Sequence, residues 1–398
     1  MNKILINILH IIIIVIEIIF LPLMVFACFA GRIMSRRFDV GIGPEPLINN
    51  FYHKKALESQ GFKVETFVNH LYYITDKFDK KFIFNKYLSL IIVRILHLDF
   101  YYSVFNYNRL YIYFNGGPLM KSKILYKIEP FLYKLSNIKV LVMPYGSDVQ
   151  NLDKIHNNLI FKNAIICDYP EQFKNQSILR KKVELWSKYS SFVVSGCDWV
   201  DHTPFWNKLL VSHFSIDLNY LDSVVRANKN IKNELSGRIV KVLHAPNHKN
   251  IKGTSYIEKA VLKLQKEGYR LELLLVDKCS NEVILGKIEE SDIVIDQLII
   301  GWYAMFSIEA LACRKPTICY LREDLYSLYE SQGFFEDNPL PLINANYKNI
   351  YDVLKKLIDH PETWVSIGIK GRAYVEKMHS IEAMGRVFKK INEDMSEG

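Results

Sequence analysis

The stretch SDIVIDQLIIGWYAMFSIEALACRKPTICY, residues 291–320, decides the fold of this chain. It opens with a short apolar run at 292–296, which predicts a buried strand, and continues into a loop that begins at Gly301. Residues 305–314 are rich in helix formers, and a Lys-Pro pair ends this helix before a second apolar strand at 317–320. Strand, glycine loop, helix and strand form a βαβ unit, so the stretch predicts an α/β fold with a parallel sheet.

The glycine loop and the helix after it also predict a ligand site. A helix N-terminus that follows a glycine turn, beside the C-terminal ends of strands, presents unpaired N–H groups to an anionic ligand. Glu309 lies about one turn into the helix, where its carboxylate can accept hydrogen bonds from hydroxyl groups of a sugar or a ribose. The alternative is a solvated Glu on an ordinary amphipathic helix, which is the usual setting for this side chain. Spacing alone leaves both interpretations open.

Residues 308–318, IEALACRKPTI, resemble the signature of the retaining glycosyltransferases with two Rossmann-like domains, the GT-B fold. The family form has a Glu, seven residues, a second Glu, a few small residues, Gly-Lys-Pro and an apolar strand. The second Glu corresponds to Glu309, the first falls on Gly301, and the Gly before Lys-Pro is Arg314. The resemblance implies two doubly wound α/β domains and transfer of a sugar from a nucleoside diphosphate. At Gly301 the site is expected to lose an acceptor for the donor sugar and to gain room.

A second loop, residues 245–254, follows an apolar strand and is predicted to bind the diphosphate of the donor. It carries Lys252-Gly253 at the mouth of a helix, where a cation and free N–H groups suit an anion. The family has an Arg and a Lys-Gly here, so Asn247 takes the place of the Arg and Lys249 can substitute for it. Without the resemblance, Lys252 is an exposed loop lysine whose replacement leaves the fold intact. The predicted donor-binding residues are His244, Asn247, Lys249, Lys252, Gly253, Gly301, Trp302, Ser307 and Glu309.

The first half of the chain carries residues expected to face the sugar. The segment PYGSD, residues 144–148, ends a buried strand and resembles the family's His-Gly-Ser-Asp, in which the His faces the donor sugar. Tyr145 replaces that His, and a Tyr can donate a hydrogen bond but cannot serve as a base at neutral pH. Asp148 remains as the carboxylate at this strand end. Tyr145, Asp148 and Glu309 form the predicted catalytic set.

Two glycine loops in the same half predict the acceptor side. Residues 41–46, GIGPEP, follow a strand and open a helix, but a full G-x-G-x-x-G is missing, so they are only a weak signal of a dinucleotide site. The loop resembles the first turn of the acceptor domain in the same glycosyltransferases, and a plain tight turn is the alternative. A glycine pair at 116–117 ends an aromatic-rich segment. The predicted acceptor-side residues are Gly43, Glu45, Gly116 and Gly117.

Residues 4–30 form one nearly unbroken apolar run that is long enough to span a bilayer. Glu17 near its middle costs roughly 2.5–3.5 kcal/mol on insertion scales, which the surrounding isoleucines offset. A cleaved signal peptide is the alternative, although the apolar core is too long for a typical one. The basic excess at Arg32, Arg36 and Arg37 predicts a single-pass anchor in the cytoplasmic (inner) membrane, with the body in the cytoplasm.

Composition limits the number of domains, the cellular compartment and the kinds of ligand that this chain can have. The chain has 398 residues, 49% of them hydrophobic, which is enough for two cores. Its six cysteines show no Cys-x-x-Cys, which favours a reducing compartment. No Asp-x-Asp pair is present to hold a metal against a diphosphate, so neither a metal nor a cofactor other than the donor substrate is expected. The net charge of +9 is spread along the chain without a nucleic-acid motif, which favours anionic lipid or a phosphorylated substrate over nucleic acid.

The predicted fold class is therefore α/β, with two Rossmann-like doubly wound domains (GT-B) preceded by an N-terminal hydrophobic membrane helix. The predicted parts are an anchor at 1–37, an acceptor-side domain at 38–220, a linker at 221–237, a nucleotide-sugar-binding domain at 238–378, and a C-terminal helix at 379–398 that packs back on the first domain.

The predicted function is transfer of a sugar from a nucleotide-diphosphate donor to a glycan acceptor. The acceptor is expected to be lipid-linked and to belong to a bacterial envelope polysaccharide (capsule, O-antigen or lipopolysaccharide), and the reaction to retain the anomeric configuration without metal. The alternative is a membrane-anchored bilobed protein that binds a sugar or a nucleotide without catalysis. Loss of the first Glu, at Gly301, and of the His, at Tyr145, favours this alternative.

Overall fold

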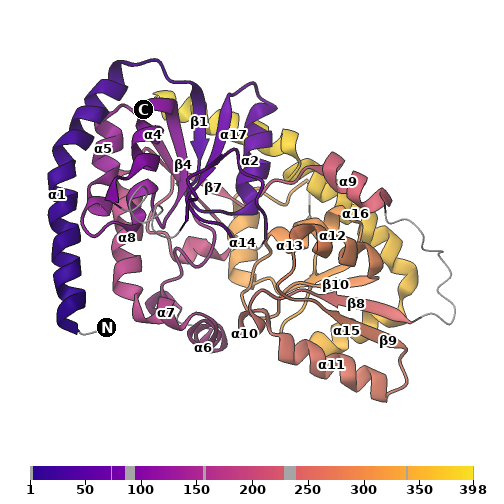
Figure 1. Ribbon diagram of the computed structural model, residues 1–398. Helices are drawn as coiled ribbons and strands as arrows, with labels where there is room; N and C mark the ends of the chain where they lie inside the picture. The colour runs from indigo at the N-terminus through magenta and orange to yellow at the C-terminus, as the bar shows by residue number, and fades with distance from the viewer. Residues whose placement is uncertain are drawn as a thin grey trace.

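The computed structural model describes residues 3–72, 74–85, 95–155, 158–227, 239–337 and 339–397. Two sheets organise the chain, and every strand pair in both of them is parallel (Figure 1). We call the part built on the seven-stranded sheet the N-terminal domain and the part built on the five-stranded sheet the C-terminal domain. This arrangement confirms the predicted α/β class with two doubly wound sheets.

The N-terminal sheet has the strand order β3-β2-β1-β4-β5-β6-β7. Side chains alternate along its central strands, so Val40 and Tyr111 belong to the core on one face while Leu110 and Val140 belong to the core on the other. Because both faces are covered, these strands read as continuous apolar runs. The strands are β1 (Phe38–Ile42), β2 (Val64–Val68), β3 (Lys80–Lys81), β4 (Tyr107–Tyr113), β5 (Lys139–Met143), β6 (Phe192–Gly196) and β7 (Lys208–Leu210).

Helices cover both faces of this sheet. One face carries α2 (Ile48–Glu58) and α17 (Ile381–Glu397), which pack against each other. The opposite face carries α4 (Leu98–Asn106), α5 (Glu129–Leu135) and α8 (Gln176–Tyr189). The long N-terminal helix α1 (Lys3–Ile33) packs on the outside of α4 and α5, along one edge of the molecule (Figure 1).

The C-terminal sheet has the order β12-β11-β10-β8-β9. Its strands are β8 (Val240–His244), β9 (Leu271–Leu275), β10 (Ile293–Ile295), β11 (Thr317–Cys319) and β12 (Ile343–Asn344). Residues of α12 (Asn281–Glu290), α13 (Met305–Ala312) and α16 (Trp364–Met378) join one core cluster, and those of α11 (Thr254–Lys266) and α15 (Ile350–Asp359) join another. The βαβ unit predicted at 291–320 is β10, α13 and β11.

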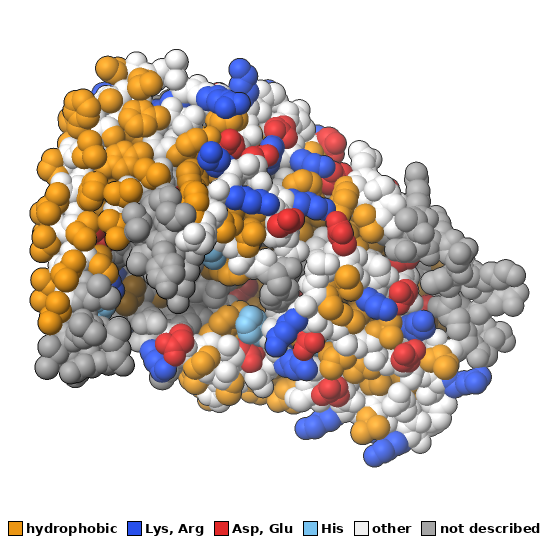
Figure 2. Space-filling model, viewed as in Figure 1, with side chains coloured by type: hydrophobic (Ala, Val, Ile, Leu, Met, Phe, Trp, Pro, Cys, Tyr) orange, Lys and Arg blue, Asp and Glu red, His pale blue; other side chains and the backbone are white. Residues whose placement is uncertain are grey.

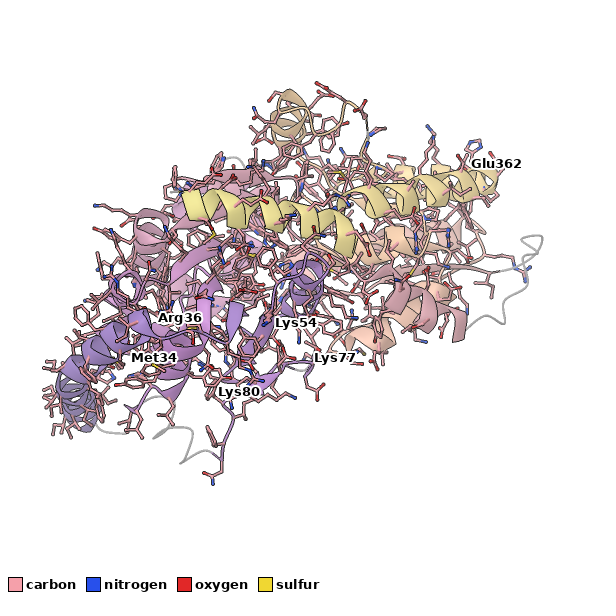
Figure 3. All side chains as sticks on the ribbon, turned by 90° about the horizontal axis from the view of Figure 1, so that it is seen from above. Met34, Arg36, Lys54, Lys77, Lys80 and Glu362 are labelled. Carbon is pink, nitrogen blue, oxygen red and sulfur yellow. The ribbon has the colours of Figure 1, made fainter. Side chains whose placement is uncertain are left out.

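Each domain also receives a helix from the other part of the chain. The connection between β5 and β6 contains α6 (Leu159–Asp168), which packs against α10 (Lys249–Lys252) in the C-terminal domain. The last two helices lead back, so that α17 lies over the N-terminal sheet (Figure 3). The remaining elements are η2 (Pro118–Lys121), η3 (Leu125–Lys127), η4 (Leu152–Lys154), α7 (Pro170–Lys174), η5 (Cys197–Asp201), α9 (Leu218–Ala227), α14 (Glu323–Ser331) and η6 (Pro361–Thr363).

The structure describes part of the predicted linker and nearly all of the predicted membrane helix. The described part of the predicted linker, 221–227, is the end of α9, and its remainder lies outside the described residues. Within the described residues, one helix, His10–Ile33, is long and apolar enough to cross a membrane, with a mean hydropathy of 3.0. A signal sequence or a core helix of a soluble protein can have the same length and apolar composition as a membrane-spanning helix.

Candidate functional site

The strand order locates one crevice in each domain. In doubly wound sheets, ligands bind beyond the carboxyl ends of the strands, at the point where the strand order reverses. This point lies between β1 and β4 in the N-terminal sheet and between β8 and β10 in the C-terminal sheet. The loops after these four strands contain most of the residues predicted from the sequence.

Lys252 lies at the end of α10, after β8, and forms an ion pair with a buried carboxylate. Its ammonium nitrogen is 2.5 Å from Oδ1 of Asp296, which follows β10 and is 1% exposed. The other oxygen of Asp296 accepts a hydrogen bond from Ser307 Oγ at 2.7 Å. The structure thus brings together Lys252 and Ser307, two predicted donor residues, through an Asp that sequence reasoning missed. The description of Lys252 as an exposed loop lysine is wrong, because its side chain is only 19% exposed.

Glu309 is buried on α13, so a solvated position on the helix surface is excluded. Its side chain accepts a hydrogen bond at 2.6 Å from Nδ2 of Asn281, the first residue of α12. Burial raises the pKa of Glu309 to about 7, and the nearby Asp296 adds to this rise, whereas the bond from Asn281 opposes it. Near neutral pH the carboxyl group therefore exists in both protonation states and can accept or donate a hydrogen bond.

His244, the last residue of β8, is fully buried between two partners. Its Nδ1 lies 2.8 Å from the carbonyl oxygen of Ile295, and its Nε2 lies 2.9 Å from Thr254 Oγ1. Burial lowers the pKa of His244 to about 4, so the ring is neutral and carries one N–H. Because a carbonyl can only accept, Nδ1 donates to Ile295 and Nε2 accepts from the Thr254 hydroxyl. His244 holds the start of α11 against β10 and brings no positive charge to a phosphate.

Gly301 does not leave the open space that the missing Glu suggests. Its φ is +106°, and a Cβ at this position would lie 2.4 Å from Cγ and Cδ of Arg322. The guanidinium of Arg322 pairs with Asp201 of the N-terminal domain and with Asp324, each at 2.5 Å. The expectation of gained room is therefore wrong, since the Arg322 side chain fills this space.

The loop before Gly301 is occupied by a side chain of the protein itself. Oε1 of the buried Gln297 accepts hydrogen bonds from the backbone N–H groups of Ile299 and Ile300, at 2.9 and 2.8 Å, and from that of Gly301 at 3.4 Å. Successive N–H groups that converge on one oxygen form the kind of concavity that binds anions. Here the amide oxygen of Gln297 takes that position.

Trp302 contacts the other domain. It is 2% exposed, its ring centroid lies 4.7 Å from that of Tyr329 in a tilted contact, and its Nε1–H donates to the carbonyl oxygen of Val211 at 3.0 Å. Since Val211 follows the last strand of the N-terminal sheet, Trp302 joins the two domains. This contact gives Trp302 a structural role that the loop sequence alone does not reveal.

The other predicted donor residues lie around α10. Gly253, with φ of +78°, joins α10 to α11, a conformation that favours glycine. Lys249 forms an ion pair with Asp277 at 3.5 Å, and both side chains are about half exposed. Asn247 is exposed in the loop before α10. Lys249 and Asn247 are therefore accessible to a ligand, whereas Gly253 shapes the backbone.

On the N-terminal side, a chain of hydrogen bonds crosses the switch point. The Glu45 carboxylate, 2% exposed, accepts a short hydrogen bond from the Tyr72 hydroxyl. Nδ2 of Asn115 donates to the other oxygen of Glu45 at 3.2 Å and to the Tyr145 hydroxyl oxygen at 2.7 Å. Burial, reinforced by the charge of Glu45, raises the pKa of Tyr145 well above its ordinary value. Tyr145 therefore stays protonated, and sequence reasoning missed both Asn115, which bonds to Tyr145, and Tyr72, which bonds to Glu45.

Asp148 fixes the turn after β5. Its two oxygens accept backbone N–H groups from Phe114, Tyr145 and Gly146, at 3.0, 2.9 and 3.0 Å. Burial raises the pKa of Asp148 to about 7, although these three bonds oppose the rise. The carboxylate of Asp148 is therefore engaged in hydrogen bonds to the backbone at the ends of β4 and β5.

The predicted acceptor-side glycines lie at close approaches inside the protein. A Cβ on Gly43 would lie 2.1 Å from the Phe67 carbonyl oxygen, and one on Gly117 would lie 2.5 Å from Glu129 Oε1. Gly116 has a φ of +109°. These three glycines allow the loops to pack, and Glu45 is the one predicted acceptor-side residue that has a polar side chain.

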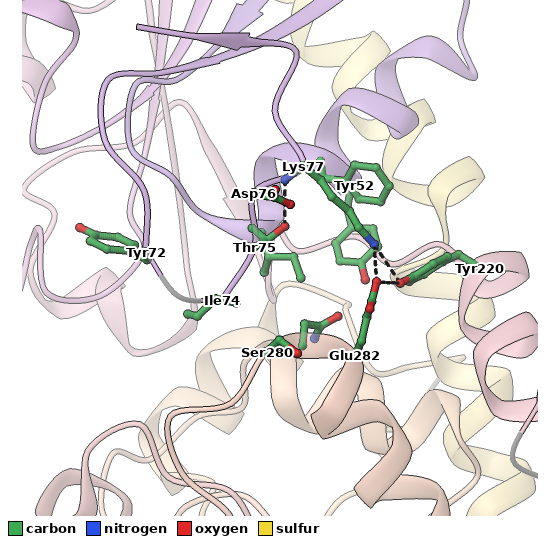
Figure 4. Close-up of a pocket in the computed structure, with 12 residues that line it drawn as sticks. Tyr52, Tyr72, Ile74, Thr75, Asp76, Lys77, Tyr220, Ser280 and Glu282 are labelled. Carbon is green, nitrogen blue, oxygen red and sulfur yellow. Dashed lines mark hydrogen bonds and ion pairs between the residues drawn. The ribbon is translucent and has the colours of Figure 1, made fainter. Parts of the chain in front are cut away.

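The two sides meet at a cavity of about 230 Å³ between the domains (Figure 4). Tyr72, the partner of Glu45, lines it from the N-terminal domain, and Asn281, the partner of Glu309, lines it from the C-terminal domain. Lys77 extends toward α12, and its ammonium donates to Tyr220 Oη at 2.9 Å and to Glu282 Oε1 at 3.0 Å. The cavity thus brings together hydroxyl, amide and charged groups suited to a polar ligand.

Comparison with known proteins gives the fold. No family model and no curated sequence matches the chain. Sucrose-phosphate synthase from Thermosynechococcus elongatus is similar in structure, with a TM-score of 0.55 and 13% identity over 91% of this chain and 100% of that chain. The catalytic domain of starch synthase IV from Arabidopsis thaliana, bound to ADP and acarbose, has a TM-score of 0.53 and 10% identity over 92% of this chain and 100% of that chain. Anabaena HepE in complex with UDP has a TM-score of 0.52 and 11% identity over the same shares.

At these identities the likeness concerns the fold. The neighbours share two parallel-sheet, Rossmann-like domains with this chain, which matches the resemblance stated from residues 308–318. The chain therefore has the two-domain fold of the GT-B glycosyltransferases.

Proposed function

We propose that this protein is a glycosyltransferase that moves a sugar from a nucleotide-diphosphate donor to a glycan acceptor. One observation carries the proposal: the switch point of the C-terminal sheet holds a buried carboxyl group, Glu309, and a half-buried cation, Lys252, and the Asn281 partner of Glu309 lines a cavity shared with the other domain. The structures of HepE with UDP and of starch synthase IV with ADP support a nucleotide in a protein of this fold.

In this proposal, Glu309 accepts the ribose hydroxyl groups and Lys252 faces the diphosphate. The charge that develops on the leaving diphosphate is the main feature to stabilise, and a fixed cation in a site that excludes water does this well. Lys249 lies in the same loop region and adds a second cation. We further propose that the reaction retains the anomeric configuration and needs no metal, in keeping with the absence of an Asp-x-Asp pair from the sequence.

On the acceptor side, Glu45 is a better candidate than Asp148 for the carboxylate that orients the attacking hydroxyl. Asp148 is engaged by three backbone N–H groups, whereas Glu45 reaches the cavity through Tyr72. Tyr145, kept protonated by its surroundings, can donate a hydrogen bond to the sugar. The glycan acceptor is proposed to be lipid-linked and part of a bacterial envelope polysaccharide, which the apolar helix α1 and the net charge of +9 support.

A second candidate function is binding of a sugar or nucleotide without transfer. The loop before Gly301 favours this second function. Its backbone N–H groups already donate to Gln297, and the Arg322 side chain covers Gly301, so these groups are not available to stabilise a leaving phosphate. Both functions place the ligand in the same cleft. They differ only in whether the bound nucleotide sugar is consumed by a transfer reaction.

Thermal stabilisation by a panel of nucleoside diphosphates and nucleotide sugars tests the site, because a ligand that binds the folded state raises the melting temperature. We expect at least one nucleoside diphosphate to stabilise the protein, and Lys252→Ala to weaken its binding about tenfold. Lys266→Ala, an exposed change on α11, is the control. Release of the nucleoside diphosphate from the stabilising nucleotide sugar, in the presence of glycan acceptors, then separates transfer from binding. Stabilisation without release favours the second candidate, and no stabilisation by any nucleotide refutes both nucleotide-binding proposals.

A further inference from the structure

Helix α1 has two different faces. Residues Glu17, Met24, Cys28 and Gly31 form a stripe that is buried against the N-terminal domain. The opposite face carries the exposed stripe Ile12, Ile19, Phe26 and Ile33, with exposed fractions of 49, 67, 69 and 86%. Exposed apolar side chains cover this helix along one edge of the molecule (Figure 2).

The buried stripe is held by polar contacts as well as by packing. The two carboxylate oxygens of Glu17 accept the backbone N–H groups of Lys123 and Ile124, at 2.7 and 2.8 Å. At the other end, a Cβ on Gly31 would lie 2.7 Å from Cγ1 of Val104, so helix and domain are in direct contact there. Just beyond the helix, Arg36 Nε donates to the Val104 carbonyl oxygen at 3.0 Å.

These contacts favour a helix that stays on the domain over one that crosses a bilayer. From Glu17 to Gly31 the helix runs for about 21 Å along the domain, at about 1.5 Å per residue. If α1 crossed the membrane in this state, the exposed Lys123 beside it would enter the hydrocarbon region. If α1 left the domain, Glu17 would lose its two N–H partners inside the membrane and those N–H groups would lose their acceptor.

A basic groove begins at the C-terminal end of the same helix. It has a volume of about 910 Å³ and includes Arg32 of α1 together with Lys134, Lys139 and Lys188, against a single acidic residue, Asp394. The rings of Phe131 and Tyr189, 4.6 Å apart, line it too. Cations beside an apolar stripe complement the phosphates and acyl chains of an anionic lipid surface.

We propose that α1 lies flat in the interface of an anionic bilayer, with its exposed stripe among the acyl chains and the basic groove on lipid phosphates. This seating takes the place of a single-pass crossing, and it does not depend on the proposed transfer reaction. A second copy of the chain is a poorer occupant, because a two-fold contact through this face would bring two basic grooves together.

The depth of α1 in the membrane tests the proposal on the full-length protein. Spin labels are placed one at a time on Ile12→Cys, Ile19→Cys, Phe26→Cys and Ile33→Cys, in a background where the accessible cysteines carry Cys167→Ser and Cys279→Ser. Bound to vesicles of phosphatidylcholine and phosphatidylglycerol, the four labels should show the same depth, about 5–10 Å below the phosphates. A spanning helix would place the two middle labels near the bilayer centre and the outer ones near opposite surfaces, which would refute the proposal. Labels that stay outside the bilayer while the protein forms a dimer would refute it too.

Charge reversal in the groove tests the lipid specificity. Lys134→Glu combined with Lys188→Glu should weaken binding to vesicles that contain phosphatidylglycerol by about tenfold or more, since surface lysines contribute strongly to binding of anionic membranes. The matched control, Lys259→Glu combined with Lys266→Glu on α11, should bind as the unchanged protein does. Equal weakening by both pairs would show that only the net charge matters and would overturn the groove assignment.

Discussion

Burial sets the protonation of Glu309, whose pKa rises from 4.5 to about 7. Between these values the unfolded chain has released a proton that the folded protein keeps, so the group lowers stability as the pH rises through this window. Above about pH 7 the full cost of the buried charge is present, and below about pH 4.5 it is absent.

Glu309→Gln removes this titration. Its stability relative to the unchanged protein should therefore increase from pH 4.5 to 7 and then level off, with a total change on the order of 3 kcal/mol for a rise of about 2.5 pKa units at about 1.4 kcal/mol per unit. Urea unfolding of both proteins at four pH values in this range measures the difference. Glu258→Gln, an exposed change on α11, is the control and should show no such trend. A pH-independent difference for Glu309→Gln would contradict the raised pKa.

The ion pair of Lys252 and Asp296 makes a second prediction at this scale. Lys252→Met leaves the 1%-exposed Asp296 with Ser307 as its remaining side-chain partner, so it should lower the free energy of unfolding by about 1–3 kcal/mol. Adding Asp296→Asn should recover part of that loss, because the uncompensated charge disappears. Chemical denaturation of the two single variants and the double variant measures the coupling. Simple additivity of the losses would show that the pair does not interact.

At the scale of elements, α1 shows how one buried polar group fixes a helix. Glu17→Ala leaves the N–H groups of Lys123 and Ile124 without their acceptor, which should cost about 1–3 kcal/mol. Glu17→Gln keeps one acceptor oxygen, so its free energy of unfolding should lie between those of the unchanged protein and Glu17→Ala. Ile18→Ala changes a side chain that is 54% exposed on the same helix, so it should lower the free energy of unfolding in detergent solution only slightly. Denaturation of the detergent-solubilised protein compares them, and equal stability of the Glu17→Ala and Ile18→Ala proteins would contradict the proposed anchoring.

Sequence patterns predicted the longer elements. They missed the shortest helix and the packing of a helix of one domain against the other domain. The helix predicted at 305–314 and the strand predicted at 317–320 are found as Met305–Ala312 and Thr317–Cys319, because helix formers, a Lys-Pro pair and an apolar run mark them locally. Helix α10 has only four residues, which is too few for a helical period to be visible. The role of α6 could not be predicted, since its partners in the C-terminal domain follow it by some 80 residues, as in the bond from Asn250 to Asp168.

The candidate site was predicted by residue type more than by arrangement. Glu309 and Lys252, both chosen from the resemblance, lie near the switch point of the C-terminal sheet, and their partners Asn281 and Asp296 come from other segments of the chain. An Asp directly after a buried strand was a signal for Asp296. No local signal marks Asn281, because its contact depends on how α12 packs beside α13.

At the scale of the whole molecule, the interface around Trp302 fixes one domain on the other. Trp302→Ala should lower the free energy of unfolding by about 3–5 kcal/mol through loss of a buried indole, and should let the domains separate. Trp302→Phe keeps the apolar contact with Tyr329, loses only the bond to the Val211 carbonyl, and should cost about 1 kcal/mol. Small-angle scattering and denaturation measure both effects. An unchanged radius of gyration and stability for Trp302→Ala would show that other contacts hold the domains.

The exchange of helices between the domains has a consequence for the order of synthesis. Phe388 and Ile391 of α17 complete a core with Leu57 and Tyr111, yet they leave the ribosome roughly 10–40 s after β7, at about 5–20 residues per second. Until then, α2 covers its face of the nascent N-terminal sheet without α17, and α6 has not yet met its partner α10. A chaperone that binds extended apolar segments has its longest opportunity in this interval, and a fragment that stops before residue 381 keeps the α17 side of this core uncovered permanently.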